Sequence, residues 1–231
     1  MMKQIDETIL NSDDTRSDNR DFVILLHGLG RTSRSMNKIV AALSRASYRA
    51  INIDYPSTQQ EIRSLVRDYV TPAVAHCLRQ GASKIHIVSH SMGGILIRDY
   101  LQQNTLPQGS RIVMLSPPNH GSEAAEFLKR FGVFRWLLGP AALQLGNGTN
   151  SVPNTLNPIA YELGILTGNK SSDPWFAWLM SGPNDGKVSV ESAKLPEMTD
   201  FRVVNCGHTM IMRSGTVIQQ IIAFLRLGRF E

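Results

Sequence analysis

The chain has 231 residues, of which 42% are hydrophobic and 19% charged, and its formal net charge is +5. This length and composition are typical of one globular domain with a sizeable core, and the modest charge, without a block of lysine and arginine, argues against a nucleic-acid partner. Two cysteines are too few for a disulfide framework or a cysteine metal site, and no apolar run approaches the roughly 18 residues of a transmembrane helix.

The first 20 residues are polar and acidic, and we expect a flexible arm there. They hold no apolar core behind a basic start, so we expect no signal peptide and a cytoplasmic protein. A continuous apolar run at 22–26 then predicts a buried parallel strand, followed by the loop 27–30. Apolar side chains at helical spacing predict a helix over 36–43, with Ser33 or Ser35 as its cap.

The middle of the chain predicts a second strand at 49–55 and a helix over 62–78 that is kinked at Pro72. Further elements are expected as strands at 84–88, 111–115, 161–166 and 201–205, and as helices at 95–101 and 216–227. This alternation predicts an α/β domain over 21–231, with a mostly parallel central sheet covered by helices on both faces.

The segment 120–158 interrupts the alternation. Its first part, 123–138, is apolar and aromatic, and Phe131 and Phe134 are our candidates there for contact with a substrate. Because the segment follows the strand at 111–115, and sites in open parallel sheets lie beyond the carboxyl ends of the strands, we expect a small helical cap over the site. Packed core is the alternative for the aromatic stripe, and its basic flanks also fit peripheral contact with a membrane.

The string Ser89-His90-Ser91-Met92-Gly93-Gly94 follows the strand at 84–88 directly and opens a helix. A serine on such a tight turn stands clear of the backbone at a helix N-terminus, which is the arrangement of a nucleophile elbow. The positions two before and two after the nucleophile must be small; Gly93 fits, and Ser89 replaces the usual glycine. The pattern therefore predicts Ser91 as a nucleophile, and an ordinary strand–turn–helix is the alternative.

A serine nucleophile requires a base and an orienting acid, which follow the serine in this class of sheet. Of the two later histidines, His208 comes just after the last predicted strand and is our base. His120 comes too early and is expected to shape the pocket wall or a turn. Asp185, in the turn Asn184-Asp185-Gly186, is our acid. Asp173 and Asp200 remain its competitors.

Acyl transfer also requires donors for the oxyanion. The N–H of Met92 follows the nucleophile, and the N–H of Leu29 belongs to the loop that faces the elbow, so these two groups are our oxyanion hole. His27 and Tyr55, which end the first two predicted strands, are further candidates for the pocket. No metal cluster is visible, and the glycine pair at 28 and 30 lacks the third glycine of a dinucleotide fingerprint.

Five strings of the sequence together resemble those of the lipase/esterase branch of the α/β-hydrolase superfamily, especially small bacterial lipase-like serine hydrolases. These strings lie at 25–31, 89–94, 118–122, 183–188 and 207–208. The resemblance implies the α/β-hydrolase fold, Ser91 as nucleophile, Asp185 as acid, His208 as base, Leu29 and Met92 as oxyanion donors, and no cofactor. The short insertion departs from families with a large lid.

These residues predict a carboxylic ester hydrolase that acts on a small-molecule or lipid ester. Thioester hydrolysis or acyl transfer on the same triad is the alternative, and a non-catalytic binding protein on the same fold is a third hypothesis. Acyl-chain length, the alcohol and the oligomeric state do not follow from the sequence.

Overall fold

The computed structural model describes residues 21–129, 132–171, 180 and 182–231, and for 132–137 only the backbone. The arm expected at 1–20 lies outside the described residues. The described strands form one sheet in the order β2-β1-β3-β4-β5-β6, and every neighbouring pair is parallel. The strands are β1 (Asp21–Leu26), β2 (Arg49–Ile53), β3 (Lys84–His90), β4 (Arg111–Leu115), β5 (Glu162–Gly168) and β6 (Asp200–Val204).

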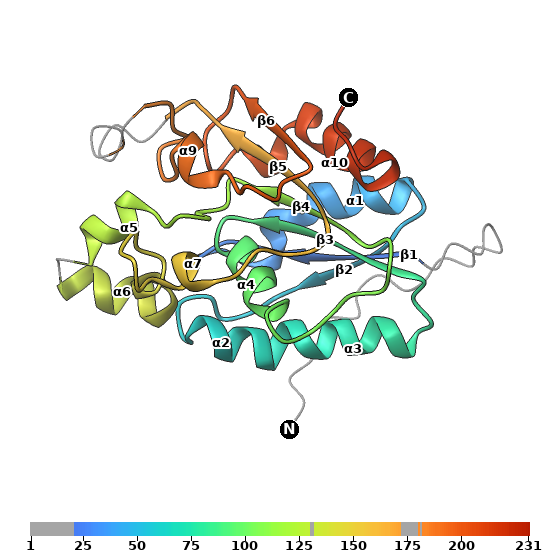
Figure 1. Ribbon diagram of the computed structural model, residues 1–231, viewed down its shortest axis with the longest axis horizontal. Helices are drawn as coiled ribbons and strands as arrows, with labels where there is room; N and C mark the ends of the chain where they lie inside the picture. The colour runs from blue at the N-terminus through green and yellow to red at the C-terminus, as the bar shows by residue number, and fades with distance from the viewer. Residues whose placement is uncertain (1–20, 130–131, 172–179, 181) are drawn as a thin grey trace.

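Helices cover both faces of this sheet, as the sequence predicts (Figure 1). Side chains alternate along β1: Phe22 and Ile24 face the layer of α2 (Ile62–Leu65), α3 (Thr71–Arg79) and α4 (Met92–Tyr100), whereas Val23 and Leu25 face α1 (Asn37–Arg45) and α10 (Gly215–Leu227). Burial on both faces explains why β1 is a continuous apolar run rather than an alternating one.

Two helix details differ from the sequence-based expectation. Neither Ser33 nor Ser35 caps α1, because a 3₁₀ turn, η1 (Ser33–Met36), precedes it and Met36 is the N-cap residue. The Ser33 N–H instead donates to Asp54 Oδ1 at 2.7 Å. The helix at 62–79 is distorted upstream of Pro72, through the π turn η2 (Val66–Val70), since a proline disturbs the turn before it.

The insertion between β4 and β5 contains α5 (Glu123–Leu128), α6 (Gly132–Leu143) and α7 (Val152–Thr155). Gly139 breaks α6 with φ 75°, and a Cβ there would overlap the backbone carbonyl of Thr58, so the insertion packs closely on the loop after β2. Gln144 Oε1 accepts the Ile62 N–H at 2.8 Å and adds a hydrogen bond across the same boundary.

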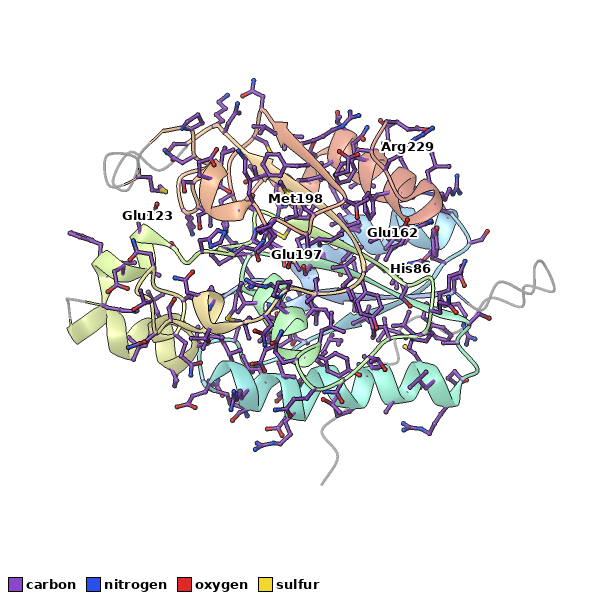
Figure 2. The ribbon with its side chains drawn as sticks, in the orientation of Figure 1. His86, Glu123, Glu162, Glu197, Met198 and Arg229 are labelled. Carbon is purple, nitrogen blue, oxygen red and sulfur yellow. The ribbon has the colours of Figure 1, made fainter. Side chains whose placement is uncertain are left out.

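The insertion sits at the carboxyl end of the sheet. Glu123, at the start of α5, lies at the opposite end of the molecule from His86, near the start of β3 (Figure 2). The remaining short helices are α9 (Val190–Ala193) and the 3₁₀ turn η3 (Ile211–Arg213). None of the helices in the described ranges is long and apolar enough to cross a membrane.

Candidate active site

Ser91 occupies a sharp turn between β3 and α4. Its φ of 52° and ψ of −122° are unusual for a serine, and its N–H donates to Leu115 O at 2.9 Å while its carbonyl accepts from Gly94 at 2.9 Å. A strained backbone at a strand–helix turn is typical of functional positions. These bonds hold the turn from both sides.

Glycine is required where the elbow meets the end of β1. A Cβ on Gly93 would lie 2.5 Å from the carbonyl oxygen of Leu26 and 2.9 Å from that of His27. A Cβ on Gly28 would lie 3.1 Å from the Cβ of Ser91, so the loop after β1 lies directly against the turn. Pairing of Leu26 with Ser89 between β1 and β3 sets this approach.

The Asp185 and His208 side chains are brought together from separate loops. His208 Nδ1 lies 2.8 Å from Asp185 Oδ2, and the His208 N–H donates to the Asp185 backbone carbonyl at 3.0 Å. Asp185 Oδ1 accepts the N–H groups of Lys187 at 3.0 Å and Val188 at 2.9 Å. Because a carboxylate only accepts, Nδ1 carries the ring proton and Nε2 of His208 is available as a base.

The electrostatics keep the Asp185 carboxyl ionised. The residue is only 1% exposed. Burial raises its pKa, but the charge and hydrogen bond of His208, the Ser116 hydroxyl and the Val188 N–H together lower the pKa below its usual value. An ionised carboxylate at this position stabilises an imidazolium on His208.

Asp200, one of the two competing candidates for the acid, lies at the far end of its strand from His208. Asp200 lies at the start of β6, and its Oδ2 accepts the Phe230 N–H at 2.7 Å, whereas His208 follows the other end of that strand. Asp200 is therefore occupied elsewhere. Asp173 lies outside the described residues.

The backbone arrangement around the two proposed oxyanion donors is ordered. Met92 begins α4, and the first N–H groups of a helix have no acceptor within it. In the loop after β1, Arg31 N–H donates to Gly28 O at 3.2 Å and Gly30 N–H to Ser57 Oγ at 3.0 Å. These bonds curl the loop, and Leu29 lines the pocket beside Ser91.

Sequence reasoning missed two buried residues that hold these groups. Ser116 follows β4 with φ 46°, is fully buried, and its hydroxyl bonds the Asp185 carboxylate. His90 Nε2 donates to the His208 carbonyl at 3.0 Å, and the two rings lie 4.8 Å apart. Burial lowers the pKa of His90 well below its usual value, so this ring is neutral beside His208. Because His90 directly precedes the predicted nucleophile, its position in the sequence could have identified it as a residue of the site.

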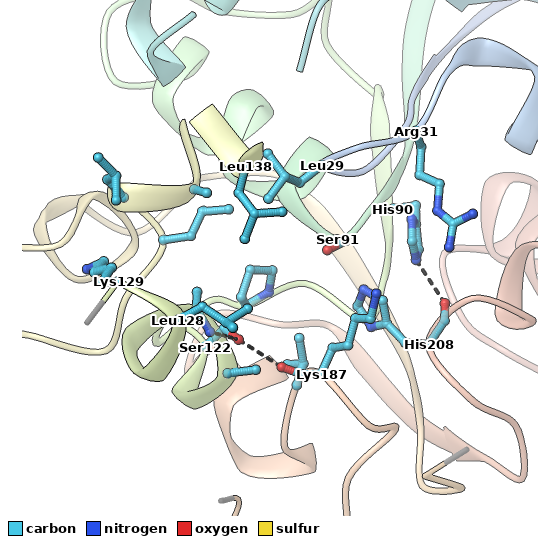
Figure 3. A pocket seen from close by; sticks show the side chains of 17 residues that line it. Leu29, Arg31, His90, Ser91, Ser122, Leu128, Lys129, Leu138, Lys187 and His208 are labelled. Atoms are coloured by element: carbon cyan, nitrogen blue, oxygen red, sulfur yellow. Dashed lines mark hydrogen bonds between the residues drawn. The ribbon is translucent and has the colours of Figure 1, made fainter. Parts of the chain in front are cut away.

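Ser91 and His208 line the same pocket, which has a volume of about 170 Å³ (Figure 3). The apolar lining comes from the loops after β1 and β4, from α5 and α6, and from the segments that follow them: Leu29, Pro118, Ala124, Ala125, Leu128, Leu138, Ala142, Leu143, Leu145 and Val188. The insertion therefore supplies most of this wall.

Three predicted pocket residues lie elsewhere. His27 stacks on Tyr55 with ring centroids 3.9 Å apart, and the Tyr55 hydroxyl donates to the His27 carbonyl, so both rings are a buried support beneath the loop. His120 is exposed and lines a separate hollow with Arg98 and Glu197.

The two aromatic candidates of the insertion are Phe131 and Phe134. Phe131 lies outside the described residues, and of Phe134 only the backbone, within α6, is described. Over the described ranges, no three His, Cys, Asp or Glu side chains gather as a metal site would require.

The profile of the alpha/beta hydrolase family matches residues 23–218 of the chain. Among solved structures, the mature lipase BlEst2 of Bacillus licheniformis is similar with a TM-score of 0.77 at 19% identity, covering 94% of this chain and 96% of that one. The phospholipase PlaB of Legionella pneumophila gives a TM-score of 0.71 at 19% identity, covering 90% of this chain and 60% of that one. Among proteins with curated functions, none matches this chain.

Proposed function

The chain belongs to the alpha/beta hydrolase family, and on that premise we propose that it hydrolyses carboxylic esters through Ser91, His208 and Asp185. Family membership supports hydrolase activity. The ester substrate and the roles of the three residues are our proposal, supported by the geometry described above.

In the first half of the reaction, Ser91 Oγ attacks the acyl carbonyl carbon while His208 Nε2 takes the hydroxyl proton. The carbonyl oxygen becomes an oxyanion, which the N–H groups of Leu29 and Met92 stabilise; each such donor is worth about 3 kcal/mol of barrier. The C–O bond to the alcohol then breaks, and His208 gives its proton to the leaving alkoxide. The acyl group remains on Ser91.

In the second half, His208 takes a proton from water, and the resulting hydroxide attacks the acyl carbon. The bond to Ser91 Oγ breaks, His208 returns the proton to Ser91, and the free acid leaves. Asp185 stays ionised throughout and holds the His208 ring in the tautomer that both halves require.

The observation that carries this proposal is the joint position of Ser91 and His208 on one largely apolar pocket, with His208 Nδ1 held 2.8 Å from a buried carboxylate. A structural histidine would not require a buried anion on one side and an open pocket on the other. Apolar walls suit the acyl chain of an ester, since each buried methylene contributes about 0.8 kcal/mol.

The test is hydrolysis of 4-nitrophenyl esters of rising acyl length by the wild type and by Ser91→Ala. We expect turnover by the wild type, kcat/KM that rises with chain length up to the depth of the pocket, and loss of turnover in the variant. Undiminished turnover by a folded Ser91→Ala protein would contradict the assignment. Turnover of acyl thioesters but not of oxygen esters would favour the thioesterase alternative.

A further inference from the structure

The pocket that contains Ser91 carries positive charge. Beside its apolar wall it is lined by Arg31, Lys129 and Lys187, and by no Asp or Glu of the described residues. A pocket for a neutral ester needs no such cations, because hydrophobic side chains with a few placed polar groups are enough to bind and orient an apolar ligand.

One of the three cations is neutralised. Lys129 Nζ lies 2.9 Å from Glu126 Oε2, one helical turn away at the end of α5. Arg31 and Lys187, by contrast, make no salt bridge with any carboxylate in the described ranges. Two positive charges without a carboxylate partner among the described residues therefore line the pocket.

The Arg31 guanidinium is fixed next to His208, and the Lys187 backbone is fixed next to Asp185. The Arg31 guanidinium donates to the hydroxyl of Thr209, the neighbour of His208, at 3.0 Å. The Lys187 backbone N–H donates to Asp185 Oδ1 at 3.0 Å, which fixes the residue two positions after the acid. In the view of Figure 3, Arg31 and Lys187 lie on the His208 side of Ser91.

The apolar side chains of α5 and α6 occupy the other side. Figure 3 shows Leu128 and Leu138 across Ser91 from Arg31, with the paired Lys129 farther out along α5. The two sides of the pocket therefore differ in chemistry, one apolar and one cationic, with the nucleophile between them.

This division assigns the two parts of an ester. His208 must protonate the leaving alcohol, so the alcohol lies on the His208 side and the acyl chain lies against the insertion. We propose that the substrates are esters of an apolar acid whose alcohol carries a negatively charged phosphate or carboxylate group, which Arg31 and Lys187 bind. The inference rests on the proposed ester hydrolysis and adds the class of alcohol to it.

The test compares three soluble esters with the same acyl chain: the monohexanoyl esters of glycerol, of glycerol phosphate and of glycerate. We expect the wild type to give a higher kcat/KM for both anionic esters than for the neutral one, and the advantage to shrink as salt is added. The phosphate and carboxylate arms identify which anion the site prefers.

Substitutions at Arg31 and Lys187 test whether the positive charge, rather than the size of the side chain, causes the preference for anionic esters. Arg31→Gln and Lys187→Gln should each lower the ratio of anionic to neutral kcat/KM by about fivefold, the effect of roughly 1 kcal/mol for a partly exposed ion pair. Arg31→Lys and Lys187→Arg keep the charge and should retain the preference. Arg34→Gln removes the same charge from an exposed side chain that does not line the pocket, and should leave the ratio unchanged.

The outcomes distinguish the proposed anionic alcohol from the proposed ester hydrolysis on which it rests. Hydrolysis of the neutral ester with no preference for the anionic esters, or a ratio unchanged in both Gln variants, overturns the charged alcohol and leaves ester hydrolysis standing. Failure of the wild type to cleave any of the three, with no turnover of 4-nitrophenyl esters, overturns the proposed function and this inference with it.

Discussion

Substitution of Gly93 by alanine tests how closely the elbow must approach β1. Gly93 is the second residue of α4, and the added methyl carbon would lie 2.5 Å from the carbonyl oxygen of Leu26 and 2.9 Å from that of His27. Both neighbours are backbone atoms at the end of a central strand, so they cannot move aside as a side chain would. The helix and strand must separate.

The expected loss of stability follows from two opposing effects. Overpacking of a fixed core position costs about 3 kcal/mol, and the better helix propensity of alanine offsets about 1 kcal/mol. The remaining loss of about 2 kcal/mol corresponds to a fall in Tm of about 4 to 8 °C for a domain of this size. The same displacement moves Leu29 relative to Ser91, and a misplacement near 1 Å lowers kcat by about 100-fold.

Thermal unfolding followed by circular dichroism and kcat with 4-nitrophenyl butyrate measure both effects. Gly215→Ala is the matched control, because Gly215 begins α10 and a Cβ there meets nothing within 4 Å. We expect its Tm to be unchanged or slightly raised and its kcat to be normal. Equal Tm and kcat in the two variants would refute the argument from close approach.

Three further outcomes are expected. Ser89→Ala should raise the free energy of unfolding by about 1 kcal/mol in urea titrations, because the buried Ser89 hydroxyl has no hydrogen-bond partner in the described part of the chain. A lower free energy of unfolding would show that this hydroxyl makes a stabilising hydrogen bond. Asp185→Asn should lower kcat by up to about 10⁴-fold, because an amide at position 185 disturbs the tautomer of His208. Asp173→Asn should change kcat little. If steady-state kinetics show the larger loss in Asp173→Asn, the acid is Asp173. Burial lowers the pKa of His86 to about 4. As the pH falls below about 6.5, the unfolded chain therefore takes up a proton at His86 that the folded protein does not bind. The free energy of unfolding should fall by about 2 kcal/mol between pH 7 and pH 5 for this reason. In urea titrations at the two pH values, His86→Asn should lose about 2 kcal/mol less than the wild type, and an equal loss would remove His86 as the cause.

Much of the fold follows from local patterns that each strand carries by itself. The apolar runs at 22–26 and 112–115 form most of β1 and β4, because strands covered on both faces are apolar along their buried length. The beginning of α1 and the π turn before Pro72 were not predicted, since the Asp54 contact of Ser33 and the packing of the distorted turn come from elsewhere in the chain.

The site, too, has features that local sequence predicts and features that depend on distant parts of the chain. The elbow and the Asn184-Asp185-Gly186 turn are local, and the Asn184 side chain indeed accepts the Gly186 N–H at 3.0 Å. The contact of Ser116 with Asp185 depends on the β4–β5 register, in which the Ser116 N–H donates to Leu166 O. No pattern within one segment predicts such a contact.

The central claim is that an acyl group passes through Ser91, and trapping that intermediate tests it most directly. The wild type is mixed with 4-nitrophenyl hexanoate, quenched in acid within the first turnovers, digested with trypsin and analysed by fragmentation mass spectrometry. The tryptic peptide 85–98 contains both Ser89 and Ser91, so fragment ions decide between them. We predict a hexanoyl group on Ser91, absent from Ser91→Ala; an acyl group on another residue, or sustained turnover with peptide 85–98 unmodified throughout the time course, would contradict the account.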